Sequence, residues 1–196
     1  MLAQAVVLQR LVEDLLLLAR GDSGALRQGR VGPVDLDEVV LDVLRERADS
    51  RVDASGVAPV QVPGDPEQLH RAVRNLVDNA VRHARNRIEV TLTPCADDAV
   101  LTVSDDGPGV AAEHAERVFE RFTRLDDARV AAEGGVGLGL AIARDIAERH
   151  GGTLVVSADG PPGARFVLRM PLIGAAGRSE QPGDLPVPRV GHRWEG

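Results

Sequence analysis

The sequence contains no lysine and no tyrosine, and its aromatic content is only 2%. Because lysine is absent, the chain cannot build a Walker A phosphate loop or the strand lysine of a protein-kinase site. The single cysteine, Cys95, excludes an internal disulfide and a cysteine-rich metal site, and it suits a reducing compartment. A formal charge of -7 and an isoelectric point near 5.2 argue against a surface built for nucleic acid.

Long apolar runs are missing as well. The apolar run at residues 15–19 is too short to span a bilayer. Residues 1–20 lack the basic start of a signal peptide, and they carry the acidic residues Glu13 and Asp14. We therefore expect a cytoplasmic location for these residues.

The two ends of the chain differ in character from its middle. Leucines at three- and four-residue steps between residues 8 and 18 predict a helix with one apolar seam, as in a coiled coil or a helical hairpin. So short a helix needs a partner helix to be stable. Residues 27–34 are predicted to be a linker, and residues 174–196, which are rich in glycine, proline and charge, are expected to be disordered.

The middle of the chain predicts an α+β fold. Asp35 and Glu38 have the spacing of a capping box before a helix that reaches about residue 47, and Asp65 precedes a long helix over about 66–84. Helices before the strands and hairpins among them predict a two-layer α/β sandwich with helices on one face. The other predicted elements are a strand interrupted by proline at 56–62, hairpins of 87–94 with 99–105 and of 152–158 with 164–172, a short helix at 111–121 and a helix ending at 150.

The long helix carries a polar stripe beside its apolar face. Asn75, Asp78, Asn79, Arg82 and His83 follow helical spacing and share one face. Asparagine is a mediocre helix former, whereas its amide oxygen is a good ligand for Mg²⁺, and arginine can hold a phosphate oxygen. A solvated helix face is the alternative interpretation.

A predicted strand ends in the segment "VSDDGPGV" at residues 103–110. A carboxylate fixed there, at Asp105, can accept a hydrogen bond from an amino group, and Gly107 and Gly109 can let a flat ring approach the backbone. A polar turn after a strand is the alternative interpretation.

A cluster of glycines, "EGGVGLGL" at residues 133–140, leads directly into a helix. Glycine is costly to order in a helix, so its presence indicates close approach of the backbone to a ligand, and helix-start N–H groups favour a phosphate. The glycines at 135, 137 and 139 do not fit the dinucleotide fingerprint, which needs G-x-G-x-x-G directly after a strand.

In this order and spacing, the three segments resemble the N, G1 and G2 boxes of the GHKL superfamily of ATP-binding domains. "VFERFTRLD" at 118–126 resembles the F box of sensor histidine kinases, and the resemblance covers about residues 34–172. It implies the Bergerat fold with a mixed sheet. It also implies a division of the chain into the second helix of a dimerisation hairpin at 1–26, a linker at 27–34, an ATP-binding catalytic domain at 35–173 and a tail at 174–196.

The resemblance implies a role for each matching residue. Asn79 is the expected principal Mg²⁺ ligand, with Asn75 at the same site, and Asp105 is the expected acceptor of the adenine amino group. Arg124 corresponds to an arginine that reaches the γ-phosphate, so Asn75 and Arg124 are the expected catalytic residues. The remaining expected ATP-binding residues are Arg82, His83, Gly107, Gly109, Thr123, Gly135, Val136, Gly137, Leu138, Gly139 and Leu140.

The same resemblance implies phosphoryl transfer. Hydrolytic members of the superfamily carry a glutamate where this chain has Asn75, and an amide cannot act as a general base. We therefore expect a histidine kinase domain that transfers the γ-phosphate to a histidine on a dimerisation domain, for passage to a response regulator aspartate. The parent protein is expected to be a homodimer, and its anchoring in a membrane is left open.

Self-phosphorylation is not expected, because the predicted early helix at 2–19 contains no histidine. One alternative is a stand-alone serine kinase and anti-sigma factor of the same superfamily. Another is a module that binds partners without nucleotide.

Overall fold

A computed structural model describes residues 31–123, 137–157 and 163–173. The predicted N-terminal helix and the predicted C-terminal tail lie outside these ranges. So do the predicted site residues Arg124, Gly135 and Val136.

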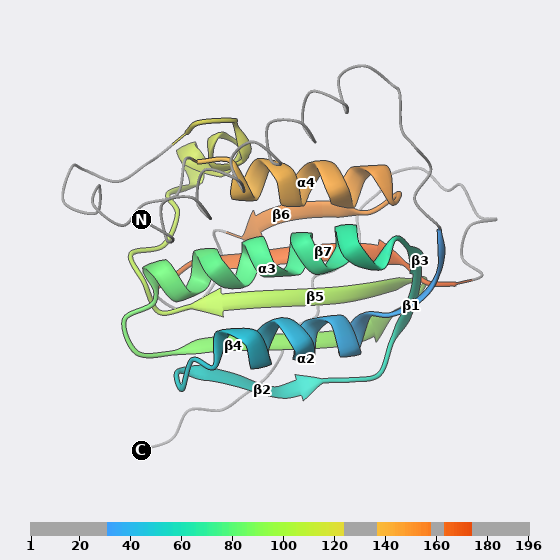
Figure 1. The fold of residues 1–196 in the computed structure, drawn as a ribbon. Coiled ribbons are helices and arrows are strands. Elements are labelled where there is room, and N and C mark those ends of the chain that lie inside the picture. The colour runs from blue at the N-terminus through green and yellow to red at the C-terminus, as the bar shows by residue number, and fades with distance from the viewer. Residues whose placement is uncertain (1–30, 124–136, 158–162, 174–196) are drawn as a thin grey trace, which may run out of the picture.

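The described residues form a five-stranded sheet whose order is β2-β4-β5-β7-β6, with the helices on one face (Figure 1). Strand β2 runs parallel to β4 and the other neighbours are antiparallel, so the sheet is mixed. The predicted two-layer α+β sandwich is confirmed. Its strands are β1 (Gly32–Asp35), β2 (Val52–Val57), β3 (Gln61–Gly64), β4 (Ile88–Cys95), β5 (Asp98–Asp105), β6 (Thr153–Ser157) and β7 (Arg165–Pro171). Its helices are α2 (Leu36–Arg47), α3 (Pro66–His83) and α4 (Gly139–Arg149), with short 3-10 turns η1 (Ala112–His114) and η2 (Arg117–Phe119).

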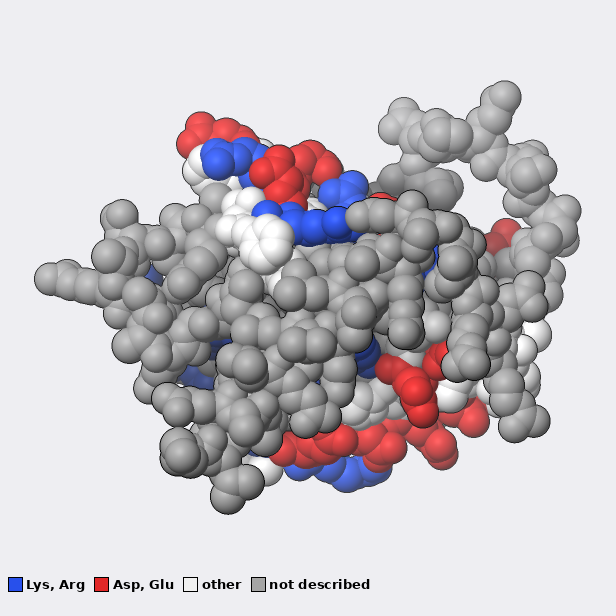
Figure 2. All heavy atoms as spheres, turned by 45° about the horizontal axis from the view of Figure 1, so that its top comes forward, with Lys and Arg blue, Asp and Glu red and all other residues white. Residues whose placement is uncertain are grey.

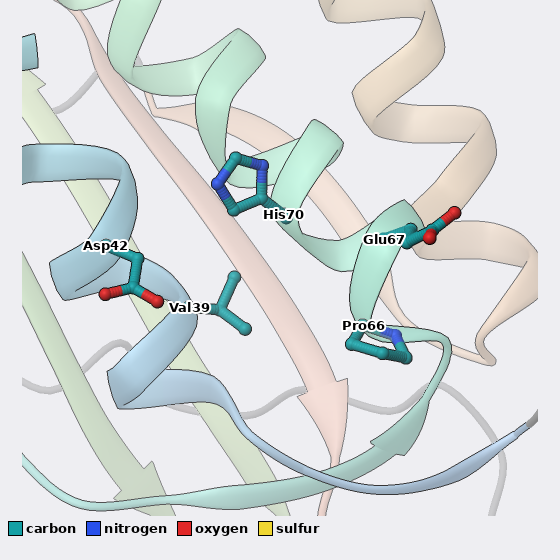
Figure 3. Close-up of a pocket in the computed structure, with 5 residues that line it drawn as sticks. All are labelled: Val39, Asp42, Pro66, Glu67 and His70. Atoms are coloured by element: carbon teal, nitrogen blue, oxygen red, sulfur yellow. The ribbon is translucent and has the colours of Figure 1, made fainter. Parts of the chain in front are cut away.

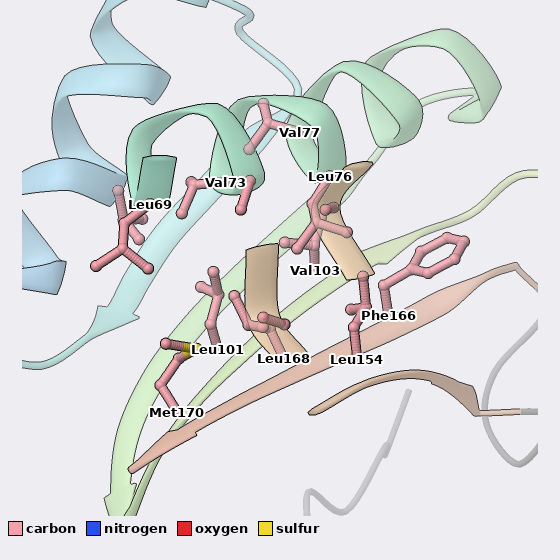
Figure 4. Close-up of a cluster of buried hydrophobic side chains, with 14 of the residues drawn as sticks. Leu69, Val73, Leu76, Val77, Leu101, Val103, Leu154, Phe166, Leu168 and Met170 are labelled. Carbon is pink, nitrogen blue, oxygen red and sulfur yellow. The ribbon is translucent and has the colours of Figure 1, made fainter. Parts of the chain in front are cut away.

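The hydrophobic core lies between the helices and the sheet (Figure 4). Side chains along a strand alternate between its faces, so every second residue of β5 and β7 points toward the helices. Helix α3 presents aliphatic residues at three- and four-residue steps to them. Each such side chain, once fully buried, stabilises the fold by about 1.5–3 kcal/mol. The core side chains labelled in Figure 4 are Leu69, Val73, Leu76, Val77, Leu101, Val103, Leu154, Phe166, Leu168 and Met170.

The starts of the first two described helices differ from each other. The Asp65 carboxylate caps α3 as predicted, since it accepts hydrogen bonds from the N–H groups of Glu67 at 2.9 Å and Gln68 at 3.2 Å. The capping box predicted for α2 does not form. The Asp35 side chain makes no cap and accepts a 2.7 Å hydrogen bond from Nε2 of Gln61 instead. The reason is the pairing of β1 with β3, which places these two residues opposite each other.

Two segments differ from their predicted secondary structure. The strand predicted at 56–62 is split at its proline, so β2 and β3 belong to different sheets. Strand β1 also begins inside the segment predicted as a linker at 27–34. Strands β1 and β3, which flank α2 and β2 in the chain, pair with each other and form a separate two-stranded sheet. Residues 58–60, around the proline, connect this small sheet to the main sheet.

The short helix predicted at 111–121 is replaced by the 3-10 turns η1 and η2. Within these turns only Phe119 is buried, so the segment has no apolar stripe long enough to hold an α-helix against the core. Across the described ranges, no helix combines the length and the apolar character needed to cross a bilayer.

A histidine after the end of α4 joins this helix to the start of α3. His150 Nδ1 lies 2.8 Å from the Ile146 carbonyl oxygen, and its Nε2 accepts a 3.1 Å hydrogen bond from the Asp65 N–H. The two partners fit the ring tautomer with its hydrogen on Nδ1. The side chain therefore fixes the residue that caps α3.

Replacing this histidine tests the connection between the two helices. His150→Ala leaves the Asp65 N–H and the Ile146 carbonyl without their side-chain partner, so we expect a loss of about 1–2 kcal/mol in the free energy of unfolding. Urea unfolding followed by circular dichroism measures it. The control is His70→Ala, whose side chain contacts the exposed Glu46 at 3.4 Å and holds no helix cap, and it should lose less stability than His150→Ala. Equal effects of both variants would contradict the proposed connection.

Candidate functional site

The candidate site is centred on the last residue of β5. Asp105 is 7% exposed, and its Oδ1 accepts hydrogen bonds from the N–H groups of Gly107 at 2.9 Å and Ala164 at 3.4 Å. The Asp105 N–H in turn donates to the Ala164 carbonyl at 2.9 Å. The backbone of two neighbouring segments therefore fixes this carboxylate.

The second oxygen of the same carboxylate has no such support. Oδ2 of Asp105 is buried, and no described residue donates a hydrogen bond to it. Burial raises the pKa of Asp105, although the Gly107 and Ala164 N–H groups partly oppose this change. A buried acceptor without a donor is costly, so the geometry suits a ligand that brings an N–H group.

Glycines make this arrangement possible. A Cβ atom on Gly107 would lie 2.7 Å from Asp105 Oδ1 and would also collide with the His83 carbonyl oxygen. A Cβ on Gly163 would collide with the Asp105 carbonyl oxygen. Gly109 has a positive φ of 79°, and a Cβ there would lie 3.0 Å from the Gly163 oxygen. The three glycines therefore allow the loop after β5 and the start of β7 to close around the aspartate.

The neighbouring Asp106 turns away from this site. Its carboxylate accepts hydrogen bonds from the N–H groups of Arg85 at 2.7 Å and Asn86 at 3.0 Å, in the turn between α3 and β4. These backbone hydrogen bonds, led by those of Asn86, lower its pKa to about 2. Of the two adjacent aspartates, Asp105 is thus available to a ligand and Asp106 holds the turn.

The start of α4 lies against the middle of α3. The position of a Cβ on Gly139 would be 3.5 Å from Oδ1 of Asn75, and Nδ2 of Asn75 is buried without a partner among the described residues. Leu138, which is 2% exposed, anchors the residue before the helix. Among the described residues no side chain caps the first turn of α4, whose N-cap position is occupied by Leu138. Its N–H groups and the helix dipole therefore favour an anion.

The polar residues predicted as one stripe on α3 do not share the same surroundings. Asp78 faces α2, where it forms an ion pair with Arg47, and it lies 3.9 Å from Arg74 on its own helix. Its role is therefore to hold α2 on α3. Asn79 is half-buried and Arg82 is exposed.

The predicted site residues Thr123 and Gly137 lie next to each other just before α4. The Phe122 N–H donates to the Gly137 carbonyl at 3.0 Å, and Gly137 has a positive φ of 75°. The Thr123 carbonyl oxygen would lie 2.9 Å from a Cβ on Gly137, so Thr123 contacts this glycine through its main chain. The structure thus joins the F-box segment to the G2 segment. Leu140 is half-buried in the first turn of α4.

A cavity of about 360 Å³ lies elsewhere, between α2 and the start of α3 (Figure 3). It is lined by Val39, Asp42, Pro66, Glu67 and His70. Its lining residues on α3 precede Arg82 and His83 by 12 to 17 residues, a distance of about 18–25 Å along the helix. This cavity is therefore not part of the predicted site.

Sequence reasoning missed the residues that hold Asp105 from β7. Ala164 lies 59 residues after Asp105 in the chain. The sequence assigned Gly163 to an ordinary hairpin turn and Ala164 to the start of the following strand, with no contact to Asp105. Arg165, the first residue of β7, directs its Nε to the Ser104 hydroxyl oxygen at 3.3 Å. The Pro-Pro-Gly run before β7 was the available signal, because a glycine there indicates a close backbone approach.

With this geometry established, known proteins can be compared. Residues 64–174 match the family described as histidine kinase-, DNA gyrase B-, and HSP90-like ATPase. The chain belongs to this family. The probable sensor histidine kinase TcrY of Mycobacterium tuberculosis is 41% identical over 172 residues, which cover 84% of this chain and 36% of TcrY. The chain therefore spans about a third of the length of this curated relative.

Solved structures of histidine kinases have the same fold. The mycobacterial sensor histidine kinase MprB has a TM-score of 0.63 and 36% identity, with 72% of this chain and 97% of that chain covered. Full-length ShkA, solved in complex with AMPPNP, has a TM-score of 0.69 and 27% identity, with 84% of this chain and 36% of that chain covered. The resemblance to the GHKL superfamily is thereby confirmed, and the chain contains the catalytic domain of a sensor histidine kinase.

Gly107→Ala tests the steric requirement at Asp105. The added methyl group would overlap the His83 carbonyl and the Asp105 carboxylate, so we expect a loss of about 1–3 kcal/mol in the free energy of unfolding. The matched control is Gly32→Ala, where a Cβ has nothing within 4 Å. Denaturant unfolding of both variants measures the difference, and a control as destabilised as Gly107→Ala would refute the steric argument.

Asp106→Asn tests the role of the second aspartate through pH. The folded pKa of about 2 lies below the ordinary value of 3.8, so the carboxylate stabilises the fold above pH 4 and this contribution disappears as pH falls toward 2. The wild type should exceed Asp106→Asn in unfolding free energy by a constant margin from pH 7 to pH 5, and the margin should shrink in more acidic buffer. Urea unfolding over this pH range measures it. A margin that grows on acidification would contradict the assignment.

Proposed function

We propose that this domain binds Mg²⁺-ATP and transfers the γ-phosphate to a histidine of a dimerisation domain outside these residues. The observation that carries the proposal is the buried Oδ2 of Asp105, which has no donor among the described residues. It lies at the end of a strand, where glycines let the loop after β5 and the residues before β7 close around the carboxylate. An adenine amino group would supply the missing hydrogen bond.

The triphosphate would extend from this point toward the start of α4. The uncapped first turn of α4 offers N–H groups, and Arg82 and His83 lie at the end of α3 that is nearest to Asp105. The His83 main chain touches Gly107, so adenine and phosphate contacts would be made by adjoining segments.

The residues present fit a hard cation. Asn75 and Asn79 offer neutral amide oxygens one helical turn apart, and amide oxygens are suitable ligands for Mg²⁺. Among the described residues there is no cluster of acidic and histidine side chains that would hold a metal without substrate. Mg²⁺ bound with the phosphates would neutralise part of their negative charge.

The side chain of Asn75 favours transfer over hydrolysis. It occupies the position at which hydrolytic members of the superfamily carry a glutamate, and an amide cannot take a proton from water. We therefore propose weak intrinsic hydrolysis and transfer to an acceptor side chain, with Arg124 at the γ-phosphate. A response regulator would accept the phosphoryl group afterwards, and the parent protein would be a homodimer. The relatives described above are sensor kinases, which favours this function over a serine kinase and anti-sigma factor.

Nucleotide binding is tested with the two adjacent aspartates. Asp105→Asn places an amide donor where the acceptor Oδ2 stands, so we expect affinity for AMPPNP with Mg²⁺ to fall by about 10- to 100-fold. Asp106→Asn should bind within about twofold of the wild type, because that side chain faces the 85–86 turn. Calorimetry on both variants measures the affinities, and circular dichroism confirms that they are folded. Equal losses, or no binding by the wild type, would refute the proposal.

A second measurement addresses the transfer itself. The chain is incubated with γ-labelled ATP, alone and with a histidine-bearing dimerisation domain supplied separately. We expect label on the added domain and little on the chain. Strong labelling of the chain alone would contradict the proposed acceptor.

A further inference from the structure

Arg144, in the second turn of α4, contacts the segment that contains η1 and η2. Its Nη1 donates a 2.8 Å hydrogen bond to Oε2 of Glu116, and its guanidinium carbon lies 4.9 Å from the centre of the Phe119 ring. The Phe119 ring packs edge-on against Phe166 of β7 at 6.2 Å. Figure 2 shows acidic and basic side chains interleaved on this part of the surface. The arginine thus joins η2 to α4 through an ion pair with Glu116 and a cation–π contact with Phe119.

These contacts reach the start of α4 through a short stretch of backbone. Three residues after Phe119, the Phe122 N–H donates to the Gly137 carbonyl, two residues before α4 begins. The residues before α4 are thus held by Phe122, and α4 is held on η2 by Arg144, while Asn75 lies beside the first residue of the helix.

We infer that Arg144 is a positioning residue for nucleotide binding. By holding η2 on α4, it fixes the direction of the uncapped N–H groups at the start of α4, where the phosphates are proposed to bind. This inference rests on the proposed function. It adds a residue that lies outside the segments recognised from the sequence and that touches no ligand itself.

The same arginine also has a partner that serves as an internal control. Its Nε donates a 3.1 Å hydrogen bond to Oε1 of Glu148, one turn later on the same helix. Glu116 and Glu148 are both largely exposed, with side-chain exposures of 79% and 60%. Each pair should therefore contribute little to global stability. Only Glu116 belongs to the other segment, so only its loss should loosen the contact between η2 and α4.

The test compares Glu116→Gln with Glu148→Gln in the full chain. We expect Glu116→Gln to weaken binding of a fluorescent ATP analogue by about three- to fivefold, and Glu148→Gln to change it by less than about 1.5-fold. Both variants should unfold within about 2 °C of the wild type without nucleotide. Fluorescence anisotropy and thermal unfolding supply the two readouts.

Two substitutions of the arginine complete the experiment. Arg144→Met keeps the aliphatic stem and should weaken binding about five- to tenfold, whereas Arg144→Lys keeps the charge and should recover at least half of that loss on a logarithmic scale. Equal affinities of Glu116→Gln and Glu148→Gln would overturn the inference, since the arginine would then act only within its own helix. If the wild type bound no nucleotide, the proposed function would fail, and this assignment with it. Loss of affinity by Glu116→Gln with normal wild-type binding supports both.

Discussion

The position of one buried carboxylate depends on most of the sheet. Asp105 is fixed because β5 pairs with β4 on one side, where Ile88 lies opposite it, and with β7 on the other, where Ala164 exchanges hydrogen bonds with it. A shift of either register by one residue would turn the carboxylate to the opposite face of the sheet. The hydrophobic alternation of these strands therefore determines the location of the site as well as the stability of the core.

Helix α3 is held at both ends, which makes it a rigid support for the polar residues on it. At its start, Asp65 caps the helix and is itself held by His150. At its end, the guanidinium of Arg51 donates to the carbonyls of Val81 at 3.0 Å and Ala84 at 2.8 Å, and Asp49 holds this arginine in place. A cation at a helix C-terminus also interacts favourably with the helix dipole. Displacement of Asn75 and Asn79 would therefore require breaking contacts at several elements.

The sequence predicted those features that depend on local periodicity, and it missed those that depend on contacts between distant residues. The bounds of α3 follow from apolar residues at three- and four-residue steps and from the Asp65 cap, and the two hairpins follow from alternation of apolar and polar residues. These elements were therefore predictable. The bond between His150 and Asp65 joins residues 85 positions apart, and no local pattern contains it. Asp105 and Asp106 have identical side chains, so only the fold shows that Asp106 holds the turn. The ligand-binding roles assigned to the site residues remain predictions, and Arg124, Gly135 and Val136 also lie outside the described ranges.

The glycines around the site are needed for different physical reasons. Gly107 and Gly163 are required by the protein itself, because a side chain at either position would collide with its main chain. Gly139 differs, since a Cβ there would make ordinary contacts of 3.5 Å or more with Asn75, so the packing against α3 would accept an alanine at this first position of α4. Nothing in the packing of α3 against α4 explains this glycine. A ligand that approaches the backbone at the start of α4 would explain it, because the methyl group of alanine would reduce access to the N–H groups. The lack of a steric reason for Gly139 in the packing against α3 thus supports a phosphate position that the core does not require.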